Sequence, residues 1–380
     1  MRWKQWSGYH CVDTYDDFHD PEYHAIRNGA GLIDVSPLYK YDLRGKDALR
    51  LADRLITRNM KRCAVGQVFY APWCTGEGKV LQDGTLQRLS ENHIRMTAAD
   101  PTLPWLHLNA SGLEVAIDDV SEAYGALALQ GPNARLVLQS ICPDELGGLR
   151  FFWLQSTQLA GIPVVVTRTG YTGDLGYELW VASDKAVELW DALVEAGRGM
   201  GLVPAGLVAL DRARVEAGFP LIDVDFWIAD KTVVDAQRSS PYEIGLGWAV
   251  HLKKKSFVGK KALVDEKRRG ITRHFVGVAV GWAELERLYG DEGMLPQLDN
   301  EACRLGAPIY SGGRQVGKAT TTCWSPLLKQ YLALCTLDAG YHQPGQSVDL
   351  EITVEYVRRR AAGHVVALPF FDPPRKRACI

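Results

Sequence analysis

A glycine-rich segment between two short β-rich stretches places the strongest constraint on how this chain can fold. Residues 163–168 are rich in valine, residues 170–176 have glycine at every third position, and residues 177–181 again suit a strand. Two β-rich stretches joined by glycines are typical of an antiparallel hairpin with a wide turn. The spacing differs from the G-x-G-x-x-G fingerprint, and a strand follows where that fingerprint requires a helix. The segment is therefore not a dinucleotide-binding turn.

Helical and strand patterns flank this hairpin. Apolar residues recur at helical spacing in four stretches: 22–30, 46–56, 183–196 and 204–218. Beyond a basic stretch at 267–270, short strand signals and glycine turns dominate, which is typical of a small β-barrel or sandwich. We therefore predict an α+β chain with a domain boundary at about 268 to 272.

Composition and charge exclude several classes of protein. The chain has 43 Lys and Arg against 45 Asp and Glu, so it lacks the basic excess of a protein that binds nucleic acid through phosphates. Its longest uncharged stretch, 151–167, is shorter than the roughly 20 apolar residues of a membrane helix and holds several polar side chains. The N-terminus has no apolar signal core, and neither the cysteines nor the histidines have metal-ligand spacing. We expect a cytoplasmic protein with no metal site, no nucleic acid and no membrane partner.

The side chains that could carry chemistry also have simpler interpretations when they are taken singly. Asp83 stands in an Asp-Gly pair, which is common in hairpin turns. Glu216 follows Arg212 by four residues, as in an ordinary ion pair on a helix surface. Trp248 suits a core position, and Lys254 belongs to a run of three lysines typical of a solvated surface. Composition and periodicity assign none of them a function.

The order of several short motifs along the chain resembles the glycine-cleavage T-protein (aminomethyltransferase) superfamily. The segment 168–178 (RTGYTGDLGYE) is similar to that family's R-x-G-Y-T-G-E-x-G-F-E hairpin, and 210–218 (LDRARVEAG) resembles its R-D-x-L-R-L-E-A-G motif. Further matching segments occur in family order at 22–27, 31–36, 45–48, 126–132, 245–248, 257–260 and 316–320. A series of motifs in one order is far more specific than any single motif.

The resemblance implies a multi-lobed α+β fold around a central channel, with a C-terminal β-barrel, and tetrahydrofolate as cofactor. It divides the chain into a folate-binding region of two interleaved α+β lobes at 1–268, a β-barrel domain at 272–370 and a tail at 371–380. It also implies an enzyme that transfers one-carbon groups.

Motif by motif, the resemblance assigns roles to individual residues. Glu216 falls at the pterin-binding glutamate, whose carboxylate can accept two hydrogen bonds from the pterin edge. The family's G-G-x-x-D-D turn reads GKVLQD at 78–83, so Gln82 replaces one carboxylate and Asp83 becomes the expected catalytic residue. Five further residues are expected to bind the cofactor: Tyr70, Thr97, Tyr171, Trp248 and Lys254.

Departures from the family pattern favour its demethylase branch. Ile222 replaces the tyrosine of the family's L-Y-G-x-D motif, and the stretch between Asp225 and Glu243 is roughly twice the usual length. We therefore predict a methyltransferase that moves a methyl group from a small O-, S- or N-methylated substrate to N5 of tetrahydrofolate. The alternative is an aminomethyltransferase acting on a lipoyl carrier protein. The third hypothesis is a non-catalytic folate-binding protein, but the Lys-Gly-Cys-Tyr motif of such proteins does not occur in this sequence.

Overall fold

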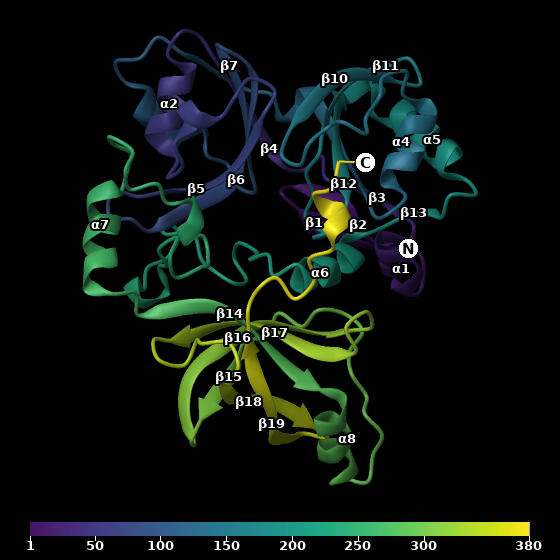
Figure 1. The fold of residues 1–380 in the computed structure, drawn as a ribbon, viewed down its shortest axis with the longest axis vertical. Coiled ribbons are helices and arrows are strands. Elements are labelled where there is room, and N and C mark those ends of the chain that lie inside the picture. The colour runs from purple at the N-terminus through teal and green to yellow at the C-terminus, as the bar shows by residue number, and fades with distance from the viewer. Residues whose placement is uncertain (380) are drawn as a thin grey trace.

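The computed structural model describes residues 1–379 and places two α+β lobes above a β-barrel (Figure 1). The lobes are interleaved in sequence, because β3 (Ala30–Asp34) joins the second lobe before the chain builds the first. A hairpin of β1 (Arg2–Trp6) and β2 (Tyr9–Thr14) precedes both. The last residue of the predicted 371–380 tail lies outside the described residues.

Lobe one (residues 39–119) is a five-stranded sheet in the order β5-β6-β7-β4-β8. Its elements are β4 (Tyr39–Arg44), β5 (Val68–Cys74), β6 (Val80–Ser90), β7 (His93–Ala98), β8 (Ala116–Asp119), α2 (Ala48–Leu55) and α3 (Leu103–Ala110). Side chains alternate between the two faces, so Ile94 and Met96 enter the core under the helices while Arg95 and Thr97 lie on the opposite face. One face of this sheet is therefore apolar and the other polar.

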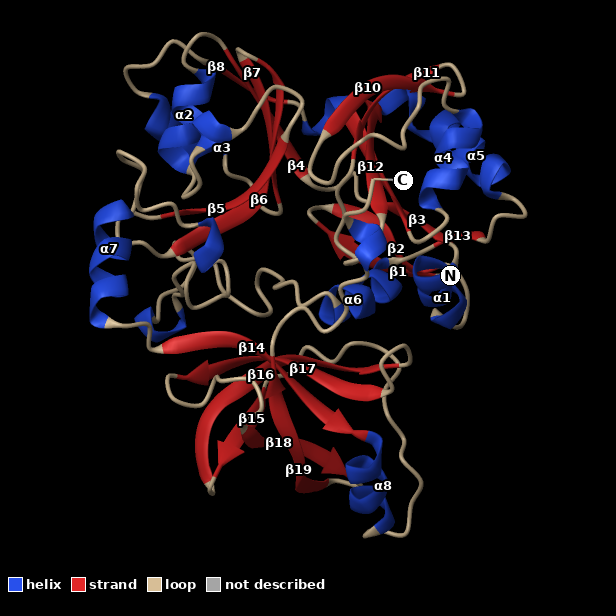
Figure 2. Cartoon of the chain, viewed as in Figure 1, coloured by secondary structure: helices blue, strands red, loops and turns tan. Residues whose placement is uncertain are grey.

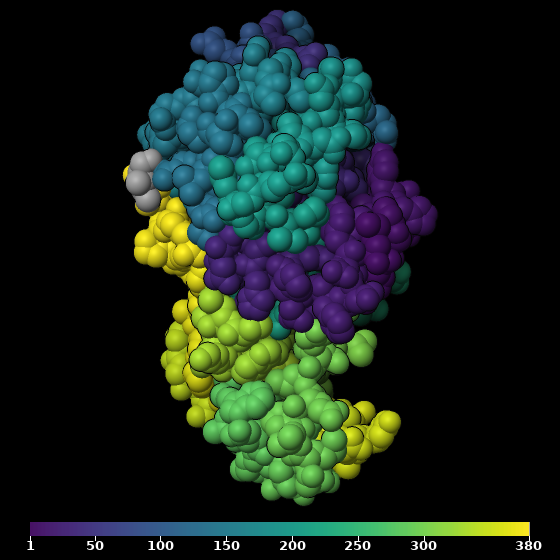
Figure 3. All heavy atoms as spheres, turned by 90° about the vertical axis from the view of Figure 1, so that its right-hand side faces the viewer, coloured from purple at the N-terminus to yellow at the C-terminus, as the bar shows by residue number. Residues whose placement is uncertain are grey.

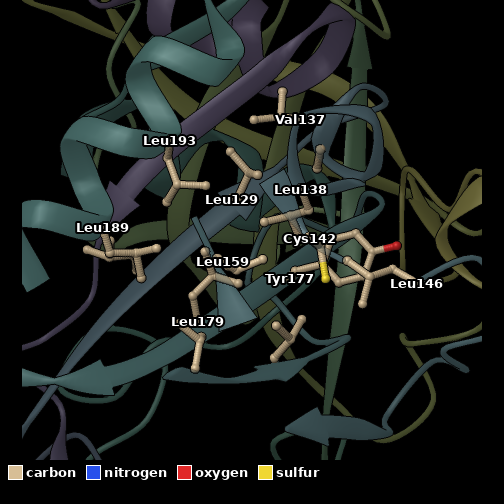
Figure 4. Packing of buried hydrophobic residues seen from close by; sticks show 14 of the residues in the cluster. Leu129, Val137, Leu138, Cys142, Leu146, Leu159, Tyr177, Leu179, Leu189 and Leu193 are labelled. Atoms are coloured by element: carbon tan, nitrogen blue, oxygen red, sulfur yellow. The ribbon is translucent and has the colours of Figure 1, made fainter. Parts of the chain in front are cut away.

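Lobe two (residues 20–34 and 124–216) is a six-stranded sheet in the order β10-β11-β12-β9-β3-β13. Its other strands are β9 (Tyr124–Gln130), β10 (Leu154–Leu159), β11 (Ile162–Thr167), β12 (Gly176–Ala182) and β13 (Leu202–Pro204). Helices α4 (Ala134–Ile141) and α5 (Ala186–Gly197) cover one face, and α1 (Asp20–Asn28) and α6 (Leu207–Glu216) cover the other. Figure 4 shows Leu189 and Leu193 of α5 directed toward the strands that carry Leu129 and Leu179.

The C-terminal region is a closed barrel in the order β14-β17-β16-β15-β18-β19. Its strands are β14 (Arg273–Gly281), β15 (Ala307–Ser311), β16 (Arg314–Ser325), β17 (Gln330–Asp338), β18 (Ser347–Val354) and β19 (Val357–Val366), with α8 (Trp282–Gly290) packed beside it. Helix α7 (Lys260–Arg269) precedes the barrel, and α6 lies at the junction of the lobes with it (Figure 2). The α+β fold with a C-terminal barrel is confirmed.

The chain after the barrel returns to lobe two, where Figure 3 shows it in yellow beside the lobe and above the barrel. Arg168 holds this segment, because its Nη2 donates to the carbonyl oxygen of Ala378 at 2.7 Å. Arg375 forms an ion pair with the buried Asp174 at 2.6 Å. Within residues 1–379, no helix is long and apolar enough to cross a membrane.

The expected hairpin is confirmed, since β11 and β12 pair antiparallel. The predicted helix from 204 begins later, at Leu207, because Pro204 ends the short strand β13, which pairs in parallel with β3.

Candidate active site

The polar face of lobe one presents the predicted catalytic residue. Asp83 lies inside β6, opposite Pro72 of β5, so the simpler interpretation as a hairpin-turn aspartate is wrong. Tyr70 and Thr85 form the cross-strand pair two positions along the same ladder, and side chains two residues apart in a strand share a face. Asp83, Tyr70 and Thr85 therefore line the same surface.

Asp83 is an enclosed carboxylate that receives one strong hydrogen bond. The hydroxyl of Tyr70 donates to its Oδ2 in a short contact, and Asp83 has no ion-pair partner among residues 1–379. Burial raises the pKa of Asp83 to about 6, although the hydrogen bond from Tyr70 acts in the opposite direction. A carboxyl group with this pKa changes its protonation state close to neutral pH, as acid–base groups do.

Thr97 supports the strand that carries Asp83. Its hydroxyl accepts a hydrogen bond from the backbone N–H of Thr85 at 3.0 Å, and it lies 2.9 Å from the Thr85 hydroxyl. The carbonyl oxygen of Thr97 lies directly above Gly84, where a Cβ would overlap it. The structure thus gives Gly84 a packing role, because only a residue without a side chain lets β7 approach β6 beside Asp83.

Gly84→Ala is expected to lower the free energy of unfolding by about 1–3 kcal/mol, the usual cost of overpacking. The added methyl group meets backbone atoms of β7, which cannot rotate away. Urea denaturation measures the effect. Gly148→Ala is the matched control, because a Cβ at Gly148 meets no atom within 4 Å and its stability should stay within about 0.5 kcal/mol of the wild type.

Lobe two contributes an aromatic ring and a second carboxylate. Tyr171 donates to the carbonyl oxygen of Pro220 at 2.6 Å, stacks on Phe219, and lies within electrostatic range of Asp83 and Tyr70. Glu178 of β12 accepts a hydrogen bond from the Thr169 hydroxyl at 2.7 Å.

Asp83, Tyr70, Tyr171 and Glu178 combine two properties. Each is deeply enclosed, and burial raises the pKa of each above its usual value. Each nevertheless keeps accessible surface. Asp83 and Tyr70 of lobe one also lie within electrostatic range of Tyr171 of lobe two.

The glycine-rich hairpin that leads to Glu178 packs around one glutamine. Gln130, at the end of β9, is fully buried and donates to the carbonyl oxygens of Thr169 and Tyr177 at 3.2 and 3.3 Å. A Cβ at Gly170 or Gly176 would overlap the Gln130 side chain. The 126–132 and 168–178 motifs therefore belong to one packing unit, which explains their glycines without any phosphate ligand.

Glu216 lies elsewhere, and its surroundings contradict the expected pterin contact. Its Oε1 accepts the hydroxyls of Tyr23 and Ser325, both at 2.5 Å, and its Oε2 accepts Nε of Arg27 at 2.8 Å. The side chain is fully buried, so its acceptor capacity is used within the protein. It does not pair with Arg212 either. Glu216 joins α1, α6 and the barrel, which is a structural role.

Lys254 is also committed to the protein. Its Nζ donates to the carbonyl oxygens of Ile56 and Arg58, both at 2.7 Å, and lies 3.2 Å from Asp53. Burial lowers its pKa to about 8, and Asp53 partly opposes this. The expected contact with an anionic cofactor tail is therefore not supported at Lys254.

Trp248 is 57% exposed, so it is not the core residue that the simplest interpretation suggested. Its ring stacks on that of Tyr70, with centroids 6.3 Å apart, and the guanidinium of Arg58 lies over it. The stacked rings of Trp248 and Tyr70 therefore connect the protein surface with Asp83.

The long segment 226–242 runs along the beginning of β6. Val80 donates its backbone N–H to Ser239 and accepts that of Ala229, so the segment flanks the strand three residues before Asp83. The middle of this segment carries an apolar side chain in solvent, since Val233 is 94% exposed.

Sequence reasoning missed Glu178. It is the last residue of the R-T-G-Y-T-G-D-L-G-Y-E segment, and it forms no ion pair within residues 1–379. The signal that could have found it is the strand alternation in β12, which puts Glu178 and Trp180 on one face and the core residues Tyr177 and Leu179 on the other.

The comparisons with known proteins all match one family. Residues 1–254 match the family described as the GCVT N-terminal domain, and residues 293–372 match the glycine cleavage T-protein C-terminal barrel domain. An aminomethyltransferase of Halothermothrix orenii is 34% identical over 92% of this chain and 90% of its own length. One of Alkaliphilus metalliredigens is 34% identical over 89% of this chain and 86% of its own. The glycine cleavage system aminomethyltransferase T of Bartonella henselae has a TM-score of 0.81 at 24% identity, covering 98% of this chain and 94% of its own, which shows the same fold.

Proposed function

Because this chain belongs to the glycine-cleavage T-protein (aminomethyltransferase) family, we propose that it transfers the aminomethyl carbon of a lipoyl carrier protein to tetrahydrofolate. The family is one of one-carbon transferases with tetrahydrofolate as acceptor, so the chain is an enzyme of this class. In the proposed reaction the bond between carbon and the lipoyl sulfur breaks, the sulfur leaves as a thiol, and the amino group leaves as ammonia. The carbon would end bonded to N5 and N10 of tetrahydrofolate, whose two N–H protons would balance the thiol and the ammonia.

The expectation of a demethylase is wrong. Relatives at 31–34% identity that cover most of this chain are aminomethyltransferases, which favours the alternative reading. We therefore no longer propose a small methylated substrate, and the proposed substrate is a lipoyl carrier protein. That expectation rested on Ile222 and the long segment 226–242, which are local departures within an otherwise typical member.

The pair of enclosed carboxylates carries the proposal. Asp83 and Glu178 are enclosed, keep accessible surface and have no cation beside them in the described part of the chain. Carboxylates and aromatic rings suit the N–H-bearing edge and flat face of a reduced pterin. When bound, tetrahydrofolate supplies the two nitrogens that accept the carbon.

The residues of the chain then have separate tasks. Glu178 would accept hydrogen bonds from the pterin edge, and Tyr171 would offer a ring against which the pterin could pack. Asp83, whose Oδ2 accepts the Tyr70 hydroxyl, would use its second oxygen in the reaction, where the ionised form would stabilise positive charge or take a proton. Holding the two reactants together would supply much of the acceleration.

Product analysis tests the proposed function. The purified protein is incubated with tetrahydrofolate and with aminomethyl-loaded lipoyl carrier protein, or with methylated aromatics, sulfonium compounds and methylamines. We expect ammonia and 5,10-methylenetetrahydrofolate with the loaded carrier and no product with the other donors. Formation of 5-methyltetrahydrofolate from a methylated donor would contradict the proposal, as would tight folate binding without any product.

Glu178→Gln is expected to raise the Kd for tetrahydrofolate about 30-fold, or about 2 kcal/mol, because the amide places a donor where an acceptor is needed. Isothermal titration calorimetry measures the change. Glu188→Gln on the exposed surface of the same lobe is the control, and its Kd should match that of the wild type. An unchanged Kd for Glu178→Gln would remove Glu178 from the binding site.

A further inference from the structure

A line of hydrogen bonds leads from the core of lobe two to Glu178. Trp180 Nε1 donates to the hydroxyl of Thr167 at 3.3 Å, the hydroxyls of Thr167 and Thr169 lie 2.7 Å apart, and the Thr169 hydroxyl donates to Glu178 Oε2 at 2.7 Å. Trp180 and both threonines are buried. The antiparallel register of β11 and β12 sets the line, because Thr167 pairs directly with Glu178.

The chemistry of the end groups fixes the direction of every proton in this line. An indole N–H can only donate, so Thr167 accepts at that end. An ionised carboxylate can only accept hydrogen bonds, so the Thr169 hydroxyl donates its single proton to Glu178. Between the two hydroxyls, Thr167 must therefore be the donor. All three donors point toward the carboxylate. The Thr167 hydroxyl also lies 3.3 Å from the backbone carbonyl oxygen of Glu178, a longer contact than its 2.7 Å contact with Thr169.

We propose that Trp180, Thr167 and Thr169 form a one-directional relay that keeps Glu178 ionised and fixes its orientation for tetrahydrofolate. The relay occupies Oε2 from behind and leaves Oε1 for the ligand. The three residues are positioning residues, because they act through Glu178 and do not touch the reacting atoms. The inference rests on the proposed function, since it assigns Glu178 to the pterin edge.

The surroundings of Glu178 explain why such a relay is needed. Burial raises the pKa of Glu178, and the hydrogen bond from Thr169 lowers it. No cation pairs with Glu178 in residues 1–379, so neutral hydroxyl donors are what holds the carboxylate in its charged form. Without Thr169 the carboxyl group would take up a proton at higher pH and stop accepting two hydrogen bonds.

The test compares Thr169→Val, which has the same shape without the hydroxyl, with Thr169→Ser, which keeps it. The first readout is the titration of the Glu178 carboxyl carbon by NMR in ¹³C-labelled protein without ligand, assigned by its loss in Glu178→Gln. We expect Thr169→Val to move the titration midpoint to higher pH and Thr169→Ser to restore it. Thr157→Val, which removes a buried hydroxyl from β10 in the same sheet, should leave the midpoint unchanged.

The second readout is the Kd for tetrahydrofolate between pH 5.5 and 8.5. Thr169→Val should weaken binding about tenfold at pH 7, the size of one charge-assisted hydrogen bond, and more at lower pH. An unchanged midpoint in Thr169→Val would overturn the relay whatever the ligand. A second outcome is that the midpoint moves but neither Thr169→Val nor Glu178→Gln changes the Kd. In that case the hydrogen bonds control the protonation of Glu178, but they do not serve tetrahydrofolate binding. The proposed purpose of the relay would then be overturned, and so would the assignment of Glu178 to the pterin edge.

Discussion

We expect Asp83→Asn to lower kcat by about a hundredfold to a thousandfold and to change the Kd for tetrahydrofolate less than threefold. Removal of one acid–base or charge-stabilising group typically has an effect of this size. The amide keeps the shape of the carboxylate and can still accept from Tyr70, so the strand pairing of β5 and β6 should persist. Steady-state kinetics with the loaded carrier and calorimetry with tetrahydrofolate separate the two quantities.

The pH profile provides the second part of this test. Because the pKa of Asp83 is raised to about 6, kcat should fall as the pH drops through 6 and Asp83 becomes neutral. In Asp83→Asn this inflection should be absent. Asp118→Asn is the control, because Asp118 lies in the exposed edge strand β8 of the same lobe. Equal losses in kcat and folate affinity would make Asp83 a structural residue.

Glu216→Ala should lower the free energy of unfolding by about 3–5 kcal/mol, which is the usual cost of removing one partner of a buried ion pair. The substitution leaves Arg27 buried without its carboxylate and frees the hydroxyls of Tyr23 and Ser325. Since these contacts join α1, α6 and the barrel, the loss should affect the whole molecule. Chemical denaturation measures it, and Glu195→Ala on the exposed surface of α5 is the control.

The same variant decides between the two roles considered for Glu216. Where Glu216→Ala remains folded, its Kd for tetrahydrofolate should stay within about threefold of the wild type, because the carboxylate has no acceptor left for a ligand. Wild-type stability combined with a large loss of folate affinity would contradict this assignment and restore Glu216 to the binding site.

Local patterns were sufficient for much of the fold. The valine-rich stretch and the glycines after it predict the hairpin of β11 and β12, and helical spacing predicts α5, because these elements depend mainly on residues close in sequence. The order of motifs predicts the family, the barrel and the cofactor, since each motif is a short segment with its own pattern. The identity of the donor was predicted wrongly from Ile222 and one long segment, because one substitution and the length of a surface segment do not specify chemistry.

By itself, the sequence determined the family, the alternation of elements and the presence of acidic residues within glycine-containing motifs. Only the tertiary structure decided which carboxylate is available to a ligand. Glu216 and Glu178 both stand in matching motifs, but Glu216 is saturated by partners 109 and more residues away, whereas Glu178 is held by Thr169 and keeps accessible surface. Whether an acceptor is used within the protein or left for a ligand depends on contacts between distant segments, and local pattern carries no information about those contacts.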